Sequence, residues 1–213
     1  MELEFFIDKL KNILISKRLK GMNSHVKMSP KIDGKPYRTL VPAGNPRLSS
    51  TLLLLIGEKF KDLKILFTLR SSNVQHHKHQ ISFPGGHCEG GENEIETALR
   101  EAREEVGIEP DMVTIIGKLS PLYVPPSDTL IIPIVGYTKL LPQLKANTNE
   151  VEEIFFHPLN YFMDFENRKI EKWIIKGNEV YVPLWRIHPS VPLWGATAMI
   201  LSEFIDIVEE IVE

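Results

Sequence analysis

An acidic helix bounded by glycines is predicted in the segment GGHCEGGENEIETALREAREEVGI, which runs from Gly85 to Ile108. Asn93 and Glu96 have the three-residue spacing of a capping box, which starts a helix. Gly107 stands where a left-handed glycine would end it. Apolar residues recur at helical spacing between these signals and predict one buried face, made of Ile95, Ala98, Leu99, Ala102 and Val106. Such a face has to be covered by a sheet or another helix.

Three glutamates, Glu101, Glu104 and Glu105, lie on one side of this predicted helix. Like charges four residues apart repel each other and weaken a helix. One interpretation is a solvated acidic face, the usual reason for a run of charges. The other is a divalent cation, because clustered carboxylate oxygens suit Mg²⁺ or Mn²⁺, which also bind phosphate oxygens. The turn at Gly85 and Gly86 lets the backbone approach a ligand or an ion closely.

Length, charge and cysteine usage exclude several classes of protein. A chain of 213 residues can bury the core of one domain. Its formal net charge of −3 gives no basic footprint for nucleic acid or a membrane surface. The single Cys88 fits a reducing compartment, and the longest apolar run, Leu52–Ile56, is too short to span a bilayer. The N-terminus lacks the apolar core of a signal peptide, so we expect a cytoplasmic protein.

Strands dominate the middle of the chain, and helices are predicted at both ends, over residues 1–20 and 195–212. The pattern predicts an α/β protein with a mixed sheet and helices on its faces. We expect residues 1–46 to form a helix and a linker packed on a domain of residues 47–213. Strands are predicted at 47–57, 63–70, 81–83, 113–119 and 130–139, with a hairpin turning at Gly177-Asn178. Residues 147–158 are predicted to be an acidic loop that runs into a strand. Residues 21–46 and 122–127 are predicted to be loops, and Pro133 predicts an edge or a bulge in its strand.

Seven positions of the acidic segment follow the pattern G-x5-E-x7-R-E-U-x-E-E-x-G-U, where U is apolar: Gly86, Glu92, Arg100, Glu101, Glu104, Glu105 and Gly107. This resembles the Nudix box, the signature of the Nudix hydrolase family. The resemblance implies an α/β/α sandwich and metal-dependent hydrolysis of a nucleoside diphosphate linked to another moiety. It also implies that Glu101, Glu104 and Glu105 are metal ligands. A backbone carbonyl of Gly85 or Gly86 is the further ligand we expect.

Segments outside the box are similar to the coenzyme A pyrophosphatase branch of that family. They are Thr68-Leu69-Arg70-Ser71, Phe83-Pro84-Gly85-Gly86, Pro125-Pro126-Ser127 and Trp194-Gly195-Ala196-Thr197-Ala198. The resemblance implies cleavage of coenzyme A or its derivatives into 4′-phosphopantetheine and adenosine 3′,5′-bisphosphate. Two positions depart from the branch pattern, since Gln75 replaces an arginine and His79 replaces a glycine. These departures keep ADP-ribose, dinucleotides and nucleoside triphosphates open as alternative substrates. An inactive nucleotide-binding module is the alternative from another class.

Several charged residues are candidates for the rest of the site. Arg47, Arg70 and Lys78 are candidates to hold substrate phosphates, together with Gly85 and Gly86. Glu150, Glu152 and Glu153 precede a predicted strand and are candidates for the general base, against the alternative of a solvated acidic loop. We expect a small nucleotide substrate and a homodimer as partners, and neither nucleic acid nor a membrane.

Overall fold

The computed structural model describes residues 1–16, 19–71, 79–140 and 143–213. In these residues the larger sheet has the strand order β10-β4-β3-β9-β7, with β5 paired to β4, β6 to β3 and β8 to β9. Its strands are β3 (Arg47–Ile56), β4 (Lys64–Arg70), β5 (Ile81–Ser82), β6 (Gly85–His87), β7 (Thr114–Lys118), β8 (Leu122–Val124), β9 (Thr129–Thr138) and β10 (Val151–Pro158).

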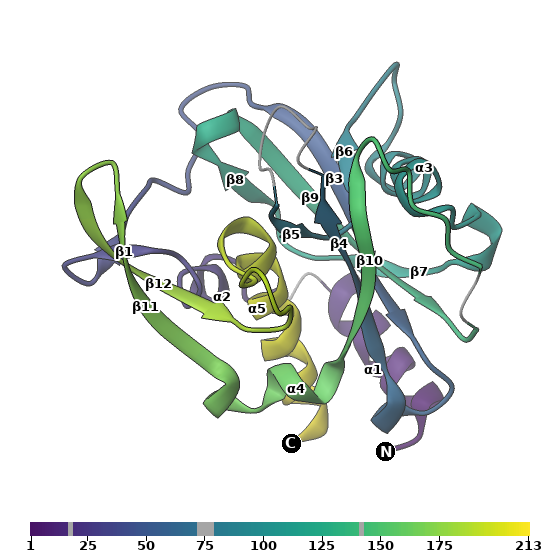
Figure 1. The fold of residues 1–213 in the computed structure, drawn as a ribbon. Helices are drawn as coiled ribbons and strands as arrows, with labels where there is room; N and C mark the ends of the chain where they lie inside the picture. Colours follow the sequence, from purple (N-terminus) through teal and green to yellow (C-terminus); the bar gives the residue numbers. More distant parts are fainter. Residues whose placement is uncertain (17–18, 72–78, 141–142) are drawn as a thin grey trace.

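A smaller sheet of order β11-β12-β1-β2 lies to the left of the larger one in Figure 1. Its strands are β1 (Lys31–Ile32), β2 (Lys35–Pro36), β11 (Arg168–Ile175) and β12 (Asn178–Trp185). The helices are α1 (Leu3–Ile15), α2 (Met22–His25), α3 (Glu94–Val106), α4 (Leu159–Met163) and α5 (Gly195–Val212).

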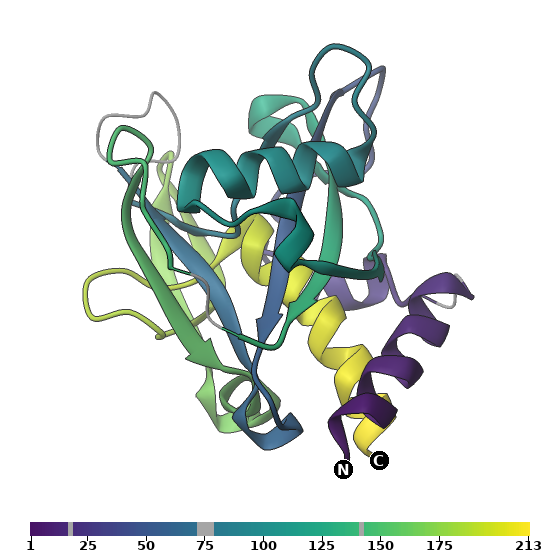
Figure 2. The ribbon, with the colours of Figure 1, turned by 90° about the vertical axis from the view of Figure 1, so that its right-hand side faces the viewer.

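The apolar run in β3 is buried on both faces of the larger sheet. Successive side chains of a strand point to opposite faces, so Leu52 and Leu54 pack with α3, whereas Leu53 and Leu55 pack with α5. β3 runs parallel to β9 and antiparallel to β4 and β6, so the sheet is mixed. Figures 1 and 2 show α3 and α5 on opposite sides of these strands. The prediction of an α/β/α sandwich with a mixed sheet is confirmed.

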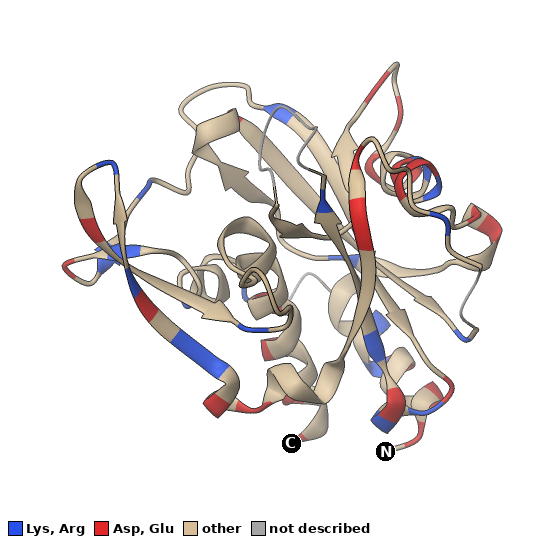
Figure 3. Cartoon of the chain, in the orientation of Figure 1, with Lys and Arg blue, Asp and Glu red and all other residues tan. Residues whose placement is uncertain are grey.

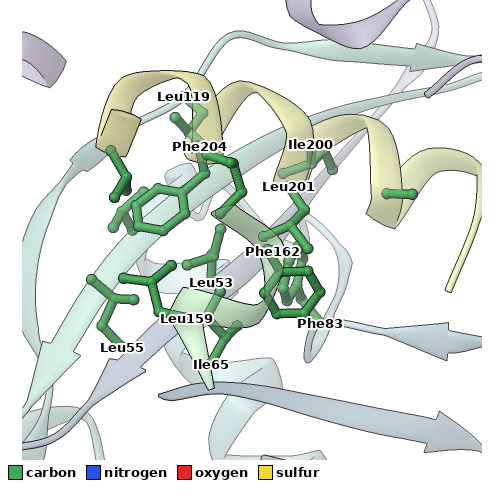
Figure 4. Close-up of a cluster of buried hydrophobic side chains, with 14 of the residues drawn as sticks. Leu53, Leu55, Ile65, Phe83, Leu119, Leu159, Phe162, Ile200, Leu201 and Phe204 are labelled. Atoms are coloured by element: carbon green, nitrogen blue, oxygen red, sulfur yellow. The ribbon is translucent and has the colours of Figure 1, made fainter. Parts of the chain in front are cut away.

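The larger core lies between the sheet and α5. In Figure 4, Ile200, Leu201 and Phe204 of α5 lie against Leu53 and Leu55 of β3, and each of these side chains is at most 1% exposed. Burying a side chain of this size contributes roughly 1.5–3 kcal/mol. This packing fixes α5 to the sheet.

The predicted N-terminal helix is α1, which packs against β7 and α5. Phe6 and Leu10 are fully buried there. Figures 1 and 2 both draw the two chain ends close together. The domain boundary at residue 46 stays a prediction. Among the described residues, no helix is both long enough and apolar enough to cross a bilayer.

The prediction of a loop over residues 21–46 is wrong in part. The short helix α2 and the hairpin β1–β2 fall within it, and Lys31 of β1 pairs with Tyr181 of β12. The hairpin turns at Asp33-Gly34, where both residues have positive φ. Asp-Gly is the dipeptide that favours such a two-residue turn. The signal was present in the sequence, although the strands beside it are only two residues long.

Three smaller differences separate the predicted elements from the observed ones. Residues 122–124 are a strand, β8, and the hairpin between β11 and β12 turns at Lys176-Gly177, one residue earlier than predicted. β9 is an interior strand rather than an edge, since β3 pairs along one side of it and β7 and β8 along the other. Pro133 falls between the last residue paired with β7, Ile134, and the first paired with β8, Ile131. A missing N–H is tolerated at such a break in the ladder.

Glu203 of α5 joins three parts of the chain inside the protein. Its carboxylate is fully buried and accepts hydrogen bonds from Gly21 N at 2.7 Å, Ser120 Oγ at 2.7 Å and Ser120 N at 2.9 Å. His25 Nε2 lies 3.3 Å from Glu203 Oε2, but the contact lacks hydrogen-bond geometry. Burial raises the pKa of Glu203, but the neighbouring His25, Ser120 and Gly21 N–H outweigh that effect, so its pKa lies below the usual range.

We expect Glu203→Ala to lower the free energy of unfolding by about 2–4 kcal/mol, because it leaves buried donors without an acceptor. A carboxyl with a lowered folded pKa stabilises the fold above its unfolded pKa of about 4.3 and loses that contribution as the pH falls through the folded value. The difference between wild type and variant in urea unfolding should therefore be full at pH 7 and shrink below pH ~4. Glu210→Ala, at an exposed position of the same helix, is the control, and equal losses in both variants would contradict the assignment.

Candidate active site

The acidic helix α3 is fixed at both ends as its sequence predicts. Asn93 Oδ1 accepts hydrogen bonds from Ile95 N at 2.9 Å and Glu96 N at 3.1 Å, and Glu96 Oε2 accepts one from Asn93 N at 2.8 Å. Gly107 ends the helix in the left-handed conformation, with φ of 76°. The capping box and the C-terminal glycine are confirmed, and together they set which residues of α3 face the sheet.

Arg100 ties the helix to the loop that precedes it. Its Nε donates to Glu92 Oε1 at 2.7 Å, Nη1 donates to Glu101 Oε1 at 2.9 Å and to Glu104 Oε2 at 3.1 Å, and Nη2 donates to the carbonyl of His87 at 3.1 Å. The guanidinium lowers the pKa of Glu92 to about 2, and the surrounding carboxylates raise the pKa of Arg100 itself. One cation thus orients three of the glutamates in the Nudix-box pattern.

Gly85 and Gly86 lie in β6, where side chains have no room. A Cβ at Gly85 would overlap the backbone of Ser50, and a Cβ at Gly86 would overlap the carboxylate of Glu101. Neither glycine has positive φ, so the sequence requires glycine here for close approach rather than for an unusual turn. The Glu101 carboxylate therefore lies directly against the backbone of β6.

Burial controls the protonation of two glutamates on α3. Glu105 is 1% exposed and accepts a hydrogen bond from Gly85 N at 3.2 Å. Desolvation raises its pKa to about 8; Arg70 and the Gly85 N–H oppose the rise, and the charges of Glu101 and Glu150 add to it. Desolvation also raises the pKa of Glu101, against the opposing effect of Arg100. Both carboxylates are placed where their negative charge is poorly compensated.

The three candidate bases in the acidic segment at the start of β10 contact different parts of the protein. The charge of Glu150 acts on both Glu101 and Glu105, so Glu150 lies at the site. Glu153 instead contacts His188, with Oε2 3.1 Å from Nε2, and Glu152 contacts His79 at 3.1 Å. Asn147 Nδ2 donates to Glu150 Oε1 at 3.2 Å and orients that carboxylate. Figure 3 shows the acidic residues of α3 facing those at the upper end of β10.

The predicted phosphate-binding cations are placed unequally. Arg70, at the end of β4, has Nη1 3.5 Å from Glu105 Oε1 and lies at the site. Arg47, at the start of β3, is exposed, and its charge lowers the pKa of His87. Lys78 lies outside the described residues, as does Gln75. Glu104 is the least buried of the three predicted metal ligands, with a side chain 55% exposed.

His87 is a site residue that the sequence analysis did not single out. Its Nδ1 lies 2.7 Å from Ser49 Oγ, and its carbonyl accepts from Arg100. Burial is the larger cause of its lowered pKa, and the charge of Arg47 adds to it. The position directly after Gly85-Gly86 was the available signal.

The residues of α3 and β6 fit a divalent cation by their chemistry. Glu101, Glu105 and Glu150 supply hard carboxylate oxygens, and the raised pKa values of Glu101 and Glu105 mark negative charge that a cation would stabilise. As the side chains of the described residues are placed, no group of three or more His, Cys, Asp or Glu residues forms a complete set of metal ligands. Arg100 holds two of the candidates, Glu101 and Glu104.

The fold and the site define an α/β/α sandwich protein with an acidic, glycine-bounded helix against its sheet. The NUDIX domain family model matches residues 46–175. The chain belongs to the NUDIX domain family.

Named relatives share parts of this chain. The human mitochondrial coenzyme A diphosphatase NUDT8 is 36% identical over 66% of this chain and 60% of its own length. The mouse peroxisomal coenzyme A diphosphatase NUDT7 is 40% identical over 54% of this chain and 48% of its own. The uncharacterized Nudix hydrolase NudL of Pectobacterium atrosepticum is 33% identical over 78% of this chain and 84% of its own. The chain thus spans about half to three fifths of the two diphosphatases.

The expected cytoplasmic localisation is contradicted by these comparisons. The human and mouse relatives carry names that place them in the mitochondrion and the peroxisome. A reducing compartment and the absence of a recognisable signal peptide were the basis of the expectation. Neither feature separates the cytoplasm from the interior of an organelle.

We expect Glu105→Gln to stabilise the metal-free protein, and more so at high pH. A carboxyl whose folded pKa is raised to about 8 favours folding below its unfolded pKa of about 4.3 and loses that contribution as the pH rises through the folded value. The free energy of unfolding in a chelator should therefore be similar for both proteins at pH 5. At pH 8.5 it should be higher for the variant, on the order of 3 kcal/mol. A variant that is less stable than wild type at pH 8.5 would contradict the assigned burial.

Proposed function

We propose that this protein hydrolyses the pyrophosphate bond of coenzyme A or its derivatives, giving 4′-phosphopantetheine and adenosine 3′,5′-bisphosphate. The observation that carries the proposal is the group of interacting carboxylates, Glu101, Glu105 and Glu150, against the backbone of Gly85 and Gly86 with Arg70 beside them. The named coenzyme A diphosphatases at 36–40% identity support the choice of substrate.

The proposal includes a divalent cation, Mg²⁺ or Mn²⁺, held by Glu101 and Glu105, with Glu104 and the Gly86 carbonyl as further ligands. When bound, such a cation neutralises charge on phosphoryl oxygens and lowers the pKa of a bound water. Glu104 is available for this role because it is the exposed member of the group. Arg100 then keeps Glu101 oriented, and its bond to the carbonyl of His87 links it to β6 as well.

The protein's own residues would act on the substrate and the attacking water. Arg70 and Arg47 donate hydrogen bonds to phosphate oxygens, which favours a charged diphosphate at this end of the sheet. Glu150 takes a proton from the attacking water. At the same time the water oxygen bonds to phosphorus and the anhydride P–O bond breaks. Asn147 fixes the Glu150 carboxylate for this step. Gly85 and Gly86 keep side chains away from the reacting group.

Glu150→Gln tests whether Glu150, and not the nearby Glu153, is the general base. The amide cannot accept the proton, so kcat should fall by about a hundredfold or more, while Glu153→Gln, in the same strand region but bound to His188, should keep most of the activity. Equal rates for the Glu150 and Glu153 variants would remove the assignment of Glu150 as the general base.

Glu101→Gln and Glu105→Gln should each reduce the rate by orders of magnitude at saturating Mg²⁺ or Mn²⁺.

The substrate is tested with a panel of pyrophosphates in Mg²⁺ and in Mn²⁺. Coenzyme A should have the highest kcat/KM, above ADP-ribose, a dinucleoside polyphosphate and a nucleoside triphosphate, with 4′-phosphopantetheine as a product identified by mass. A clear preference for ADP-ribose or a dinucleotide would favour the other hydrolases of the family. Nucleotide binding without turnover of any substrate would favour an inactive module.

A further inference from the structure

An apolar cavity of about 120 Å³ lies on the α5 side of the larger sheet, away from α3. Four segments that are far apart in the sequence form its walls: residues 29–40, the β8 region, Ile175 at the end of β11 and the start of α5. It unites two of the motifs that resemble the coenzyme A branch, Pro125-Pro126 and Trp194-Gly195-Ala196. Neither motif contributes to the carboxylate site.

The cavity is built mainly from residues outside the segment that matches the family. Tyr37, Leu40, Trp194 and Met199 line it, and all lie outside residues 46–175. A cavity wall formed outside the family segment can select one substrate among the several that a shared hydrolytic site cleaves.

The aromatic walls are held in place by specific contacts. Tyr123 donates a hydrogen bond from its hydroxyl to Asp128 Oδ1 at 2.8 Å. The rings of Trp194 and Trp173 meet edge-on with centroids 4.9 Å apart. These contacts restrain the aromatic side chains that line the cavity.

The start of α5 provides backbone polar groups beside this apolar cavity. α5 begins at Gly195, and no side chain caps its N-terminus at Trp194. The first N–H groups of a helix have no partner inside the helix, and Gly195 and Ala196 line the cavity. These donors suit a carbonyl oxygen on an otherwise uncharged ligand.

The cavity and the carboxylate site lie at the same end of the sheet. Tyr123 of β8 pairs with Leu130 of β9, Leu130 pairs with Leu48 of β3, and the carbonyl of Leu48 accepts from Cys88 N, just after β6. Three steps between neighbouring strands place Cys88 about 14 Å from Tyr123, and the site residue Gly86 lies two positions before Cys88 in the chain. Pantetheine, when extended, is roughly as long as five extended residues, or about 17 Å.

We propose that this cavity receives the thiol or acyl thioester end of the substrate's pantetheine arm. The inference rests on the proposed function. The size and charge of the cavity indicate which half of coenzyme A it receives. The adenosine half carries a ribose and a charged 3′-phosphate, whereas the cavity is well below the 300 Å³ or more that larger ligands occupy. Among the described residues that line it, Arg38 is the one cation, and it is exposed. The uncharged arm, with amide carbonyls along a slender chain, matches both the apolar walls and the start of α5.

Calorimetry with the two product halves tests the proposal without requiring turnover. Wild type should bind 4′-phosphopantetheine and adenosine 3′,5′-bisphosphate separately. Ala196→Leu, which fills the cavity from α5, should weaken 4′-phosphopantetheine binding about tenfold or more and leave the bisphosphate within about twofold. Thr197→Leu, at the next position of α5 but outside the cavity lining, is the matched control and should change neither value. Val124→Leu fills the cavity from β8 and serves if Ala196→Leu does not fold.

Weaker bisphosphate binding in the filled variants would assign the cavity to the adenosine half and overturn the proposal. Unchanged binding of both halves, or no binding of 4′-phosphopantetheine by wild type, would also overturn it. Failure of wild type to cleave coenzyme A would instead remove the proposed function, and the binding comparison would still decide what the cavity receives. In an active enzyme, Ala196→Leu should raise KM for coenzyme A and leave kcat nearly unchanged.

Discussion

The buried carboxylate of Glu105 is the constraint on which the rest of the site depends. It is 1% exposed beneath β6, and its compensation is one backbone N–H and the guanidinium of Arg70, with Nη1 3.5 Å from Glu105 Oε1. Glu101 and Glu150 add negative charge around it. A protein interior penalises such an arrangement by desolvation, and the neighbouring residues limit its cost without removing it. Because its pKa is raised to about 8, Glu105 keeps its proton at neutral pH in the metal-free protein, and a bound cation would favour the ionised form instead.

The surrounding structure keeps these carboxylates together. The capping box and Gly107 fix α3, Arg100 binds Glu92, Glu101 and Glu104, and the two glycines bring the β6 backbone within contact of Glu101. β3 supports this arrangement from below, because its leucines anchor α3 on one face and α5 on the other. Rigid elements hold functional groups more accurately than loops do, and here most of the site lies on a helix and two strands.

Local signals in the sequence predicted the parts of the structure that local chemistry controls. The helix ends, the doubly buried strand β3 and the acidic face of α3 follow from residue type and spacing. The hairpin at Asp33-Gly34 was missed because its two-residue strands gain their stability by pairing with β12. Pro133 predicted an edge or a bulge, and the structure instead has a break between β7 and β8 there, because the register of three strands decides where the ladder is interrupted. Glu150 could not be separated from Glu152 and Glu153 by sequence, since a bulge between residues 151 and 153 and contacts from distant histidines decide where each acid lies.

The protonation of Glu105 in solution shows whether its burial and its carboxylate neighbours prepare this site for a cation. The side-chain carboxyl resonances of ¹³C-labelled glutamate, assigned through Glu105→Gln, can be followed against pH in metal-free protein and again with Mg²⁺. The account predicts a Glu105 pKa near 8 without metal and a fall toward or below the ordinary value of about 4.3 with metal. A Glu105 that titrates near 4.3 in both conditions would contradict it.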